Sequence, residues 1–139
     1  GLLSCKLGFG TKNFFKGPAM TEGEALQAIL EGARLAAANR GAGPACFATG
    51  EMGIGNTTSA SALVSALVQI PVREAVGRGT GIDDEALQRK ILVIERALSA
   101  RRLEPGDPLS VLAQVGGFEI AGLVGVILAG AAGRSPMLP

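Results

Sequence analysis

Apolar residues recur at three- and four-residue intervals between Thr21 and Gly41, which predicts an amphipathic helix. Thr21 and Glu24 have the spacing of a capping box, in which each residue satisfies a backbone amide at the start of the helix. Gly41 suits the left-handed residue that commonly ends one. The apolar stripe that we expect to be buried consists of Leu26, Ile29, Leu30, Ala33 and Ala37.

Two further helical patterns carry their own start signals. Asp83 is placed to cap a helix that presents Leu87, Ile91, Ile94 and Leu98 at core spacing. Asp107 is followed by Pro108, and proline is favoured in the first turn because its missing amide hydrogen is not needed there. Both segments are therefore predicted to be helices with aspartate caps.

Residues 59–69 are small and apolar and predict a helix, and residues 119–132 are almost wholly apolar and predict a buried helix. Pro71 is expected to end the first of them. In the second, Gly122 and Gly125 would let another backbone approach closely. The uncharged run from 120 to 133 is shorter than the ~18 residues that a membrane span needs, so we expect no membrane partner.

Strand signals are few. Residues 44–49 form a short apolar run between turn residues, which predicts a buried parallel strand, and 135–138 look like the start of another. Strands mixed with helices indicate a helix-rich α/β class. One strand and the start of a second cannot complete a sheet. We therefore expect residues 1–139 to be a single domain truncated at both ends, or a chain that borrows sheet from a partner.

Composition excludes several classes of function. Thirteen basic and 12 acidic residues leave a net charge of +1, which argues against nucleic acid as a partner. The absence of histidine excludes Ser-His-Asp and Cys-His catalysis and histidine-ligated zinc. Cys5 and Cys46 lack metal-ligand spacing, and we expect both to be buried in a cytoplasmic protein. The first residues do not have the pattern of a signal peptide.

The segment from residue 50 to 58, Gly-Glu-Met-Gly-Ile-Gly-Asn-Thr-Thr, joins the predicted strand to a helix. Glycines let an anion approach the backbone, and the amides at a helix start attract phosphate. Asn56, Thr57 and Thr58 add donors or a cap. The spacing matches neither a Walker loop nor a dinucleotide-binding fingerprint. The segment predicts a phosphate site, or a turn that is glycine-rich only for tight packing.

Two charged residues bear on that choice. Glu51 would repel a phosphate if its carboxylate pointed inward, so we expect it to face a ribose hydroxyl or a cationic ring, or to cap a turn. Lys90 flanks the apolar stripe of its helix and could reach round the edge to supply a positive charge for a phosphate. The alternative is a lysine whose stem covers apolar surface while its amine stays in water.

Residues 50–58 resemble the signature of the nicotinate-nucleotide:dimethylbenzimidazole phosphoribosyltransferase family, and the stretches 10–14, 17–21, 76–84 and 116–121 are also similar to it. The resemblance implies an enzyme of cobalamin lower-ligand biosynthesis. Its members transfer 5-phosphoribose from nicotinate mononucleotide to 5,6-dimethylbenzimidazole. The products are nicotinate and α-ribazole 5′-phosphate, with inversion at the anomeric carbon.

The same resemblance implies a Rossmann-like three-layer fold with a parallel sheet, a homodimer, and no metal or organic cofactor. It also implies that Glu51 lies near the ribose, where its carboxylate could stabilise positive charge in the transition state. The substrate-binding residues that it implies are Glu51, Met52, Gly53, Ile54, Gly55, Asn56 and Lys90.

The chain departs from the family in length, so the resemblance makes it a central part of the enzyme. Members carry their general base, a glutamate, in a C-terminal segment that has no counterpart here. Glu119 does not match that base, and we expect it to be a structural carboxylate in the first turn of a helix. We therefore expect the isolated chain to be weakly active or inactive. The alternatives are a non-catalytic nucleotide-binding module, a structural fragment that self-associates, and an enzyme with another acceptor base.

Overall fold

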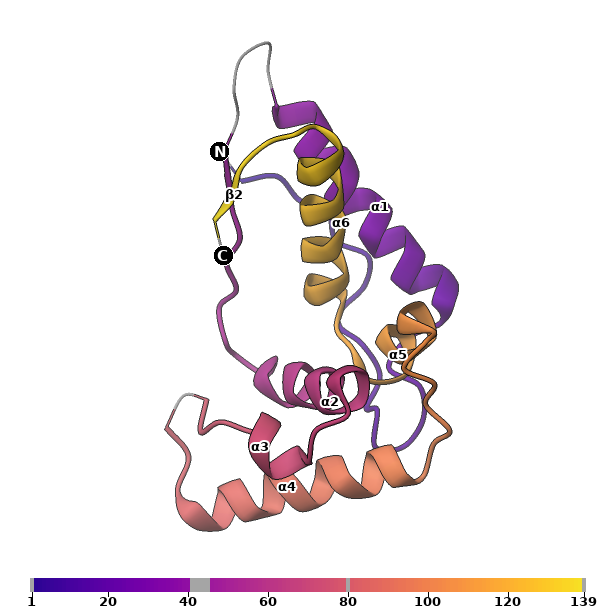
Figure 1. The fold of residues 1–139 in the computed structure, drawn as a ribbon, viewed down its shortest axis with the longest axis vertical. Coiled ribbons are helices and arrows are strands. Elements are labelled where there is room, and N and C mark those ends of the chain that lie inside the picture. The colour runs from indigo at the N-terminus through magenta and orange to yellow at the C-terminus, as the bar shows by residue number, and fades with distance from the viewer. Residues whose placement is uncertain (1, 41–45, 80, 139) are drawn as a thin grey trace.

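The computed structural model describes residues 2–40, 46–79 and 81–138. Within them the helices α1 and α6 lie together near the short strands, and α2, α3 and α4 gather at the opposite end of the molecule (Figure 1). The elements are α1 (Glu22–Asn39), β1 (Phe47–Ala48), α2 (Thr57–Val68), α3 (Val72–Ala75), α4 (Asp84–Ser99), α5 (Pro108–Val115), α6 (Phe118–Ala132) and β2 (Met137–Leu138). Gly41, predicted to end the first helix, lies outside the described residues.

The predicted caps are confirmed. The Thr21 hydroxyl accepts from the Glu24 amide at 3.1 Å, and the Glu24 carboxylate accepts from the Thr21 amide at 2.7 Å. Asp83 accepts from the Ala86 amide at the start of α4, and Asp107 accepts from the amide three residues later at the start of α5. These bonds join residues three apart, so each of these helices begins where its local sequence predicts.

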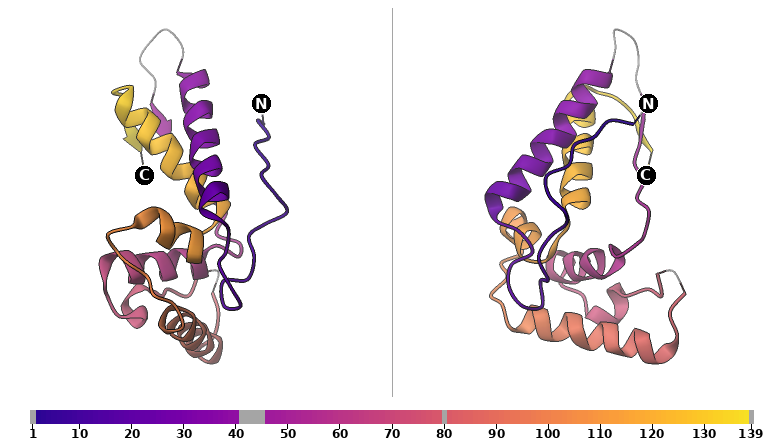
Figure 2. Two further views of the ribbon diagram at one scale, coloured as in Figure 1. Left: turned by 90° about the vertical axis from the view of Figure 1, so that its right-hand side faces the viewer. Right: turned by 180° about the vertical axis from the view of Figure 1, so that it is seen from behind.

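The helices α1 and α6 pack with their backbones almost touching (Figure 2). A Cβ added at Gly125 would lie 1.9 Å from the carbonyl oxygen of Ile29, and one added at Gly32 would lie 2.0 Å from that of Gly122. The close approach predicted for residues 122 and 125 is therefore confirmed, although beside Gly122 it is Gly32 on the facing helix that must lack a side chain. It is possible only because small residues face one another across the pair.

The buried face predicted for α1 is wrong in part, because Ile29 packs against the core but the other large residues of the stripe do not. The buried residues are Ala25, Ala28, Gly32 and Ala36, whereas Leu26 and Leu30 are 47% and 45% exposed. The reason is the short distance to α6: bulky side chains would hold the two backbones apart, so the small residues face the partner helix.

The strands β1 and β2 pair in parallel, Phe47 with Met137 and Ala48 with Leu138. The predicted α/β class with a parallel sheet is confirmed, as is the strand expected within 135–138. The prediction of a buried strand at 44–49 is wrong in its burial, because Phe47 is half-buried and Ala48 exposed. Among the described residues β2 is the one strand beside β1, so little covers it; Pro44 and Ala45 lie outside these residues.

The core of the other half lies between α2, α4 and α5. Its fully buried large side chains are Ile94, Val111 and Val115. The stripe predicted for α4 is confirmed: Ile91 and Ile94 are buried, and Leu87 and Leu98 pack against the core.

The helix expected at 59–69 runs instead over Thr57–Val68. It ends at Gln69, whose backbone is left-handed with φ of 58°, so Pro71 starts α3 rather than ending α2. Cys5 and Cys46 are both exposed free thiols, which corrects the expectation that they are buried, because neither lies on an element that packs into the core. None of the helices in the described ranges has the length and apolar character to cross a membrane.

Candidate functional site

The chain leaves β1 and enters α2 through a turn that glycine makes possible. Gly53 and Gly55 have φ values of 78° and 74°, a region that side chains with a Cβ rarely adopt. The apolar side chains of Met52 and Ile54 point outward and are 80% and 77% exposed. The turn therefore presents its backbone and two large side chains to the surroundings directly before the first residue of α2.

Glu51 turns back onto this turn. Its Oε2 accepts a hydrogen bond from the Gly53 amide at 2.6 Å. Of the roles considered for this carboxylate, closing the turn is therefore one that it performs. The same bond occupies the Gly53 amide, whereas within the described residues the amides of Ile54 and Gly55 make no hydrogen bond to the chain. These two amides are among the donors of the turn that remain for an anion.

Lys90 reaches from α4 to the first residue of α2. Its Nζ donates to Thr57 Oγ1 at 2.8 Å and to the Gly77 carbonyl oxygen at 3.4 Å. Desolvation by burial lowers the pKa of this lysine. No carboxylate within the described part of the chain forms an ion pair with it. A partly desolvated, unpaired positive charge thus lies where the helix dipole is also positive.

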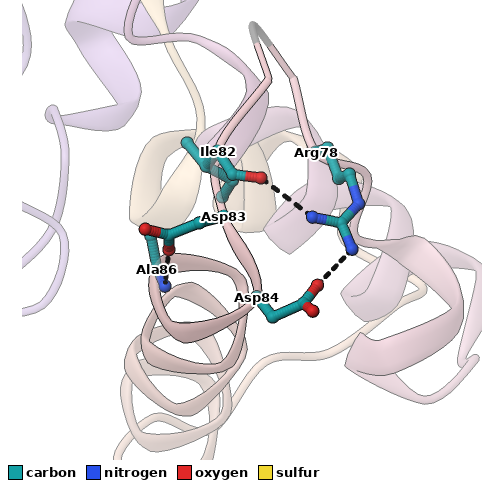
Figure 3. Close-up of polar contacts among 5 residues, drawn as sticks. All are labelled: Arg78, Ile82, Asp83, Asp84 and Ala86. Atoms are coloured by element: carbon teal, nitrogen blue, oxygen red, sulfur yellow. Dashed lines mark hydrogen bonds and ion pairs between the residues drawn. The ribbon is translucent and has the colours of Figure 1, made fainter.

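A second glycine turn, 77–81, lies against the same threonine. A Cβ added at Gly79 would be 3.0 Å from Thr57 Oγ1, so a side chain at this position would press on the hydroxyl that binds Lys90. Arg78 closes this turn by donating to the Ile82 carbonyl oxygen at 2.9 Å and pairing with Asp84 (Figure 3). The sequence pattern alone gives Arg78 no role, although a basic residue between two glycines with an acidic one a few positions later is a signal that could have found it. Thr80 lies outside the described residues.

Asn56 links this region to α6. Its Nδ2 donates to Glu119 Oε1 at 2.9 Å and makes no cap to α2 itself. Glu119 was expected to be a structural first-turn carboxylate; it does lie in the first turn of α6, and it also contacts a residue of the predicted site. Nothing in the sequence pairs two residues 63 positions apart.

A hollow of about 700 Å³ lies beside the turn, between the N-terminal segment, α1 and the start of α6. Glu51 and Met52 line it together with Glu119 and Phe118. Of the predicted residues, Glu51 and Met52 therefore line the hollow, and Gly53–Asn56 lead away from it. The amine of Lys90, which belongs to α4, lies beyond them at the start of α2. Within the described residues no group of three or more Cys, Asp or Glu could hold a metal ion.

The chain is similar in sequence to known proteins. A family model described as phosphoribosyltransferase matches residues 2–138. The nicotinate-nucleotide–dimethylbenzimidazole phosphoribosyltransferases of Desulforudis audaxviator and Chloroflexus aurantiacus are 52% and 53% identical to this chain over 137 and 139 residues. Each match covers 99% of the chain and 39% of the relative.

A solved structure agrees with these sequence matches. The crystal structure of CobT from Thermus thermophilus superposes with a TM-score of 0.88 at 46% identity, covering 99% of this chain and 41% of that one. The chain thus spans about two fifths of the length of the relatives that it matches.

Proposed function

This chain belongs to the phosphoribosyltransferase family whose model it matches, and from that membership we propose that it forms the phosphoribosyl-binding part of a nicotinate-nucleotide–dimethylbenzimidazole phosphoribosyltransferase. The reaction breaks the bond between the anomeric carbon and the nicotinate ring nitrogen, which leaves with the electron pair. The unprotonated ring nitrogen of the benzimidazole forms the new bond with its lone pair, and the other ring nitrogen loses its proton to a general base. The products are α-ribazole 5′-phosphate and nicotinate.

The phosphate of the nucleotide binds at the start of α2. The observation that carries this proposal is the contact between Lys90 Nζ and Thr57 Oγ1, which holds a positive charge at the first residue of the helix. The Ile54 and Gly55 amides add donors, and the helix dipole favours an anion there. Met52, Gly53 and Asn56 are part of the site because they form the turn that holds these two amides.

The hollow receives the ring end of the substrates. Its apolar lining includes Leu7, Phe118 and Leu123, which suits a flat aromatic base such as nicotinate or a benzimidazole. Glu51 lies at the edge of this hollow, and its bond to the Gly53 amide holds the carboxylate in one place. A fixed carboxylate there can stabilise the positive charge that develops on the ribose as the old bond breaks.

Substitution of Lys90 tests the phosphate site. We expect Lys90→Ala to weaken nicotinate mononucleotide binding about 10- to 100-fold, the value of one charge-assisted hydrogen bond. Binding of the nucleoside without phosphate should change less than about twofold by the same reasoning. Lys12→Ala, on the exposed N-terminal segment, is the control. Equal losses for nucleotide and nucleoside in calorimetry would remove Lys90 from the phosphate site.

We propose that these 139 residues are the central part of a larger catalytic domain and show little transferase activity alone. The matched motifs contain no general base, and the lack of one costs about 10²–10⁴ in rate. We place the enzyme in the cytoplasm, which its free thiols support because reducing compartments keep cysteines unpaired. A product assay on the isolated chain tests this: transfer at the rate of a full-length relative would contradict it.

We propose that the enzyme is a homodimer, a state that exposed apolar side chains on α2 and α4 support. Val64, Val68 and Leu92 are 43%, 63% and 46% exposed. Exposed apolar surface of this kind commonly marks an interface. The same feature favours the second candidate function, a structural fragment that self-associates and binds nothing. Sedimentation with and without nicotinate mononucleotide separates the two, because a purely structural fragment would associate in a way that ignores the ligand.

A further inference from the structure

Three carboxylates line the hollow within the described residues, and they differ in what holds them. Glu31 pairs with Arg34 on its own helix at 2.5 Å. Glu51 closes its own turn through the Gly53 amide. Glu119 is the one that a side chain from another element holds, because Asn56, at the start of α2, donates to it.

The carboxylate of Glu119 occupies a defined position at the start of α6. Asn56 Nδ2 holds Oε1 at 2.9 Å. The side chain also folds back over Gly117: a Cβ added at that glycine would lie 2.3 Å from Oε1 and 2.6 Å from Oε2. Oε2 makes no hydrogen bond within the described residues, so a carboxylate oxygen with free acceptor capacity faces the hollow.

Two hydrogen bonds link Glu119 to the proposed phosphate site. Asn56, which it binds, directly precedes Thr57, and Thr57 accepts from Lys90. The site is therefore positive at the Lys90 end and negative at the Glu119 end. A carboxylate repels phosphate, so the ligand group that it accepts from is one that has a hydrogen to donate and carries no negative charge. In a phosphoribosyl group the neutral donors are the ribose hydroxyls.

We propose that Glu119 accepts hydrogen bonds from the ribose hydroxyls of the bound nucleotide and makes the site selective for ribose over deoxyribose. Asn56 is a positioning residue, which acts by holding the carboxylate. This inference rests on the proposed function, because it takes the nucleotide phosphate to lie at Lys90. A site built to pair with hydroxyls rejects analogues that lack them, since its acceptor is then left unsatisfied.

The test measures the affinity of the 139-residue chain for nicotinate mononucleotide and for its 2′-deoxy and 3′-deoxy forms. The unsubstituted chain should prefer the ribose form over at least one deoxy form by about tenfold or more. Glu119→Ala should reduce this preference to about twofold by weakening ribose binding alone. Glu119→Gln keeps an acceptor for Asn56 and should fall between the two. Asn56→Ala should lower the preference less than Glu119→Ala does.

Glu31→Gln is the matched control, because it removes a carboxylate from the same hollow and should leave the preference unchanged. Equal losses for all three ligands in Glu119→Ala would mean a merely structural role and would overturn the inference. So would an unsubstituted chain that binds all three alike. If Lys90→Ala leaves nucleotide binding intact, or the unsubstituted chain binds none of the ligands, the proposed function fails and takes this inference with it.

Discussion

Gly122 and Gly125 share one helix and one neighbour, and they predict opposite responses to alanine. A Cβ added at Gly125 would lie 1.9 Å from the Ile29 carbonyl oxygen and 2.8 Å from the Ala33 amide nitrogen. These are backbone atoms, so α1 and α6 must separate to admit a methyl group. At Gly122 the nearest heavy atom would be the Ala28 carbonyl oxygen at 4.0 Å, an ordinary contact.

The magnitudes follow from two opposing effects. Alanine in place of glycine in a helix interior stabilises by about 0.8–1 kcal/mol. Overpacking a close contact costs about 1–3 kcal/mol, and a contact with rigid backbone lies at or above the upper end. We therefore expect Gly122→Ala to raise the free energy of unfolding by up to about 1 kcal/mol. Gly125→Ala should lower it by about 2 kcal/mol or more.

Urea unfolding followed by circular dichroism measures both variants. The midpoint should rise for Gly122→Ala and fall for Gly125→Ala with little change of slope. The pair is its own control, because the two substitutions have the same helix propensity and lie three residues apart on α6. If both variants shift stability in the same direction by similar amounts, backbone contact between α1 and α6 is not what requires glycine at position 125.

Two further predictions concern the proposed phosphate site. Burial lowers the pKa of Lys90 below its usual 10.5, so this lysine loses its charge at a lower pH than an exposed lysine does. Nucleotide affinity measured across alkaline pH should therefore begin to fall before an ordinary lysine titrates. An affinity that does not change up to pH 10.5 would contradict this. Arg78→Ala should loosen the turn that lies against Thr57 and weaken nucleotide binding about two- to fivefold, the range of an exposed ion pair. Arg89→Ala is the control, because it removes another exposed ion pair, on α4, and should leave the affinity unchanged in the same calorimetric titration.

Much of the fold could be predicted because its signals are local. The side chains of Thr21, Asp83 and Asp107 each accept from an amide three residues ahead. A few consecutive residues are therefore enough to predict where such a helix begins. The glycine turn and its family resemblance are likewise contained in nine consecutive residues, 50–58. The class of the fold and the family follow from these segments without knowledge of how they pack.

The burial of α1 could not be predicted in this way. Periodicity shows that a helix has an apolar face, but Leu26 and Ala25 are neighbours and either could lie on that face. The backbone of α6 decides the matter, because its glycines allow an approach that only small residues tolerate. Burial is a property of the pair of helices, and sequence patterning describes one helix at a time.

The sequence by itself determined where the capped helices α1, α4 and α5 begin, the α/β class and the glycine turn of residues 50–58. The tertiary structure alone decided that Lys90 reaches Thr57 and that Asn56 holds Glu119, across 33 and 63 positions of chain. The physical reason is range: caps and turns depend on hydrogen bonds between near neighbours, whereas these contacts exist only after α2, α4 and α6 have packed and brought distant side chains to within 2.8 and 2.9 Å of one another.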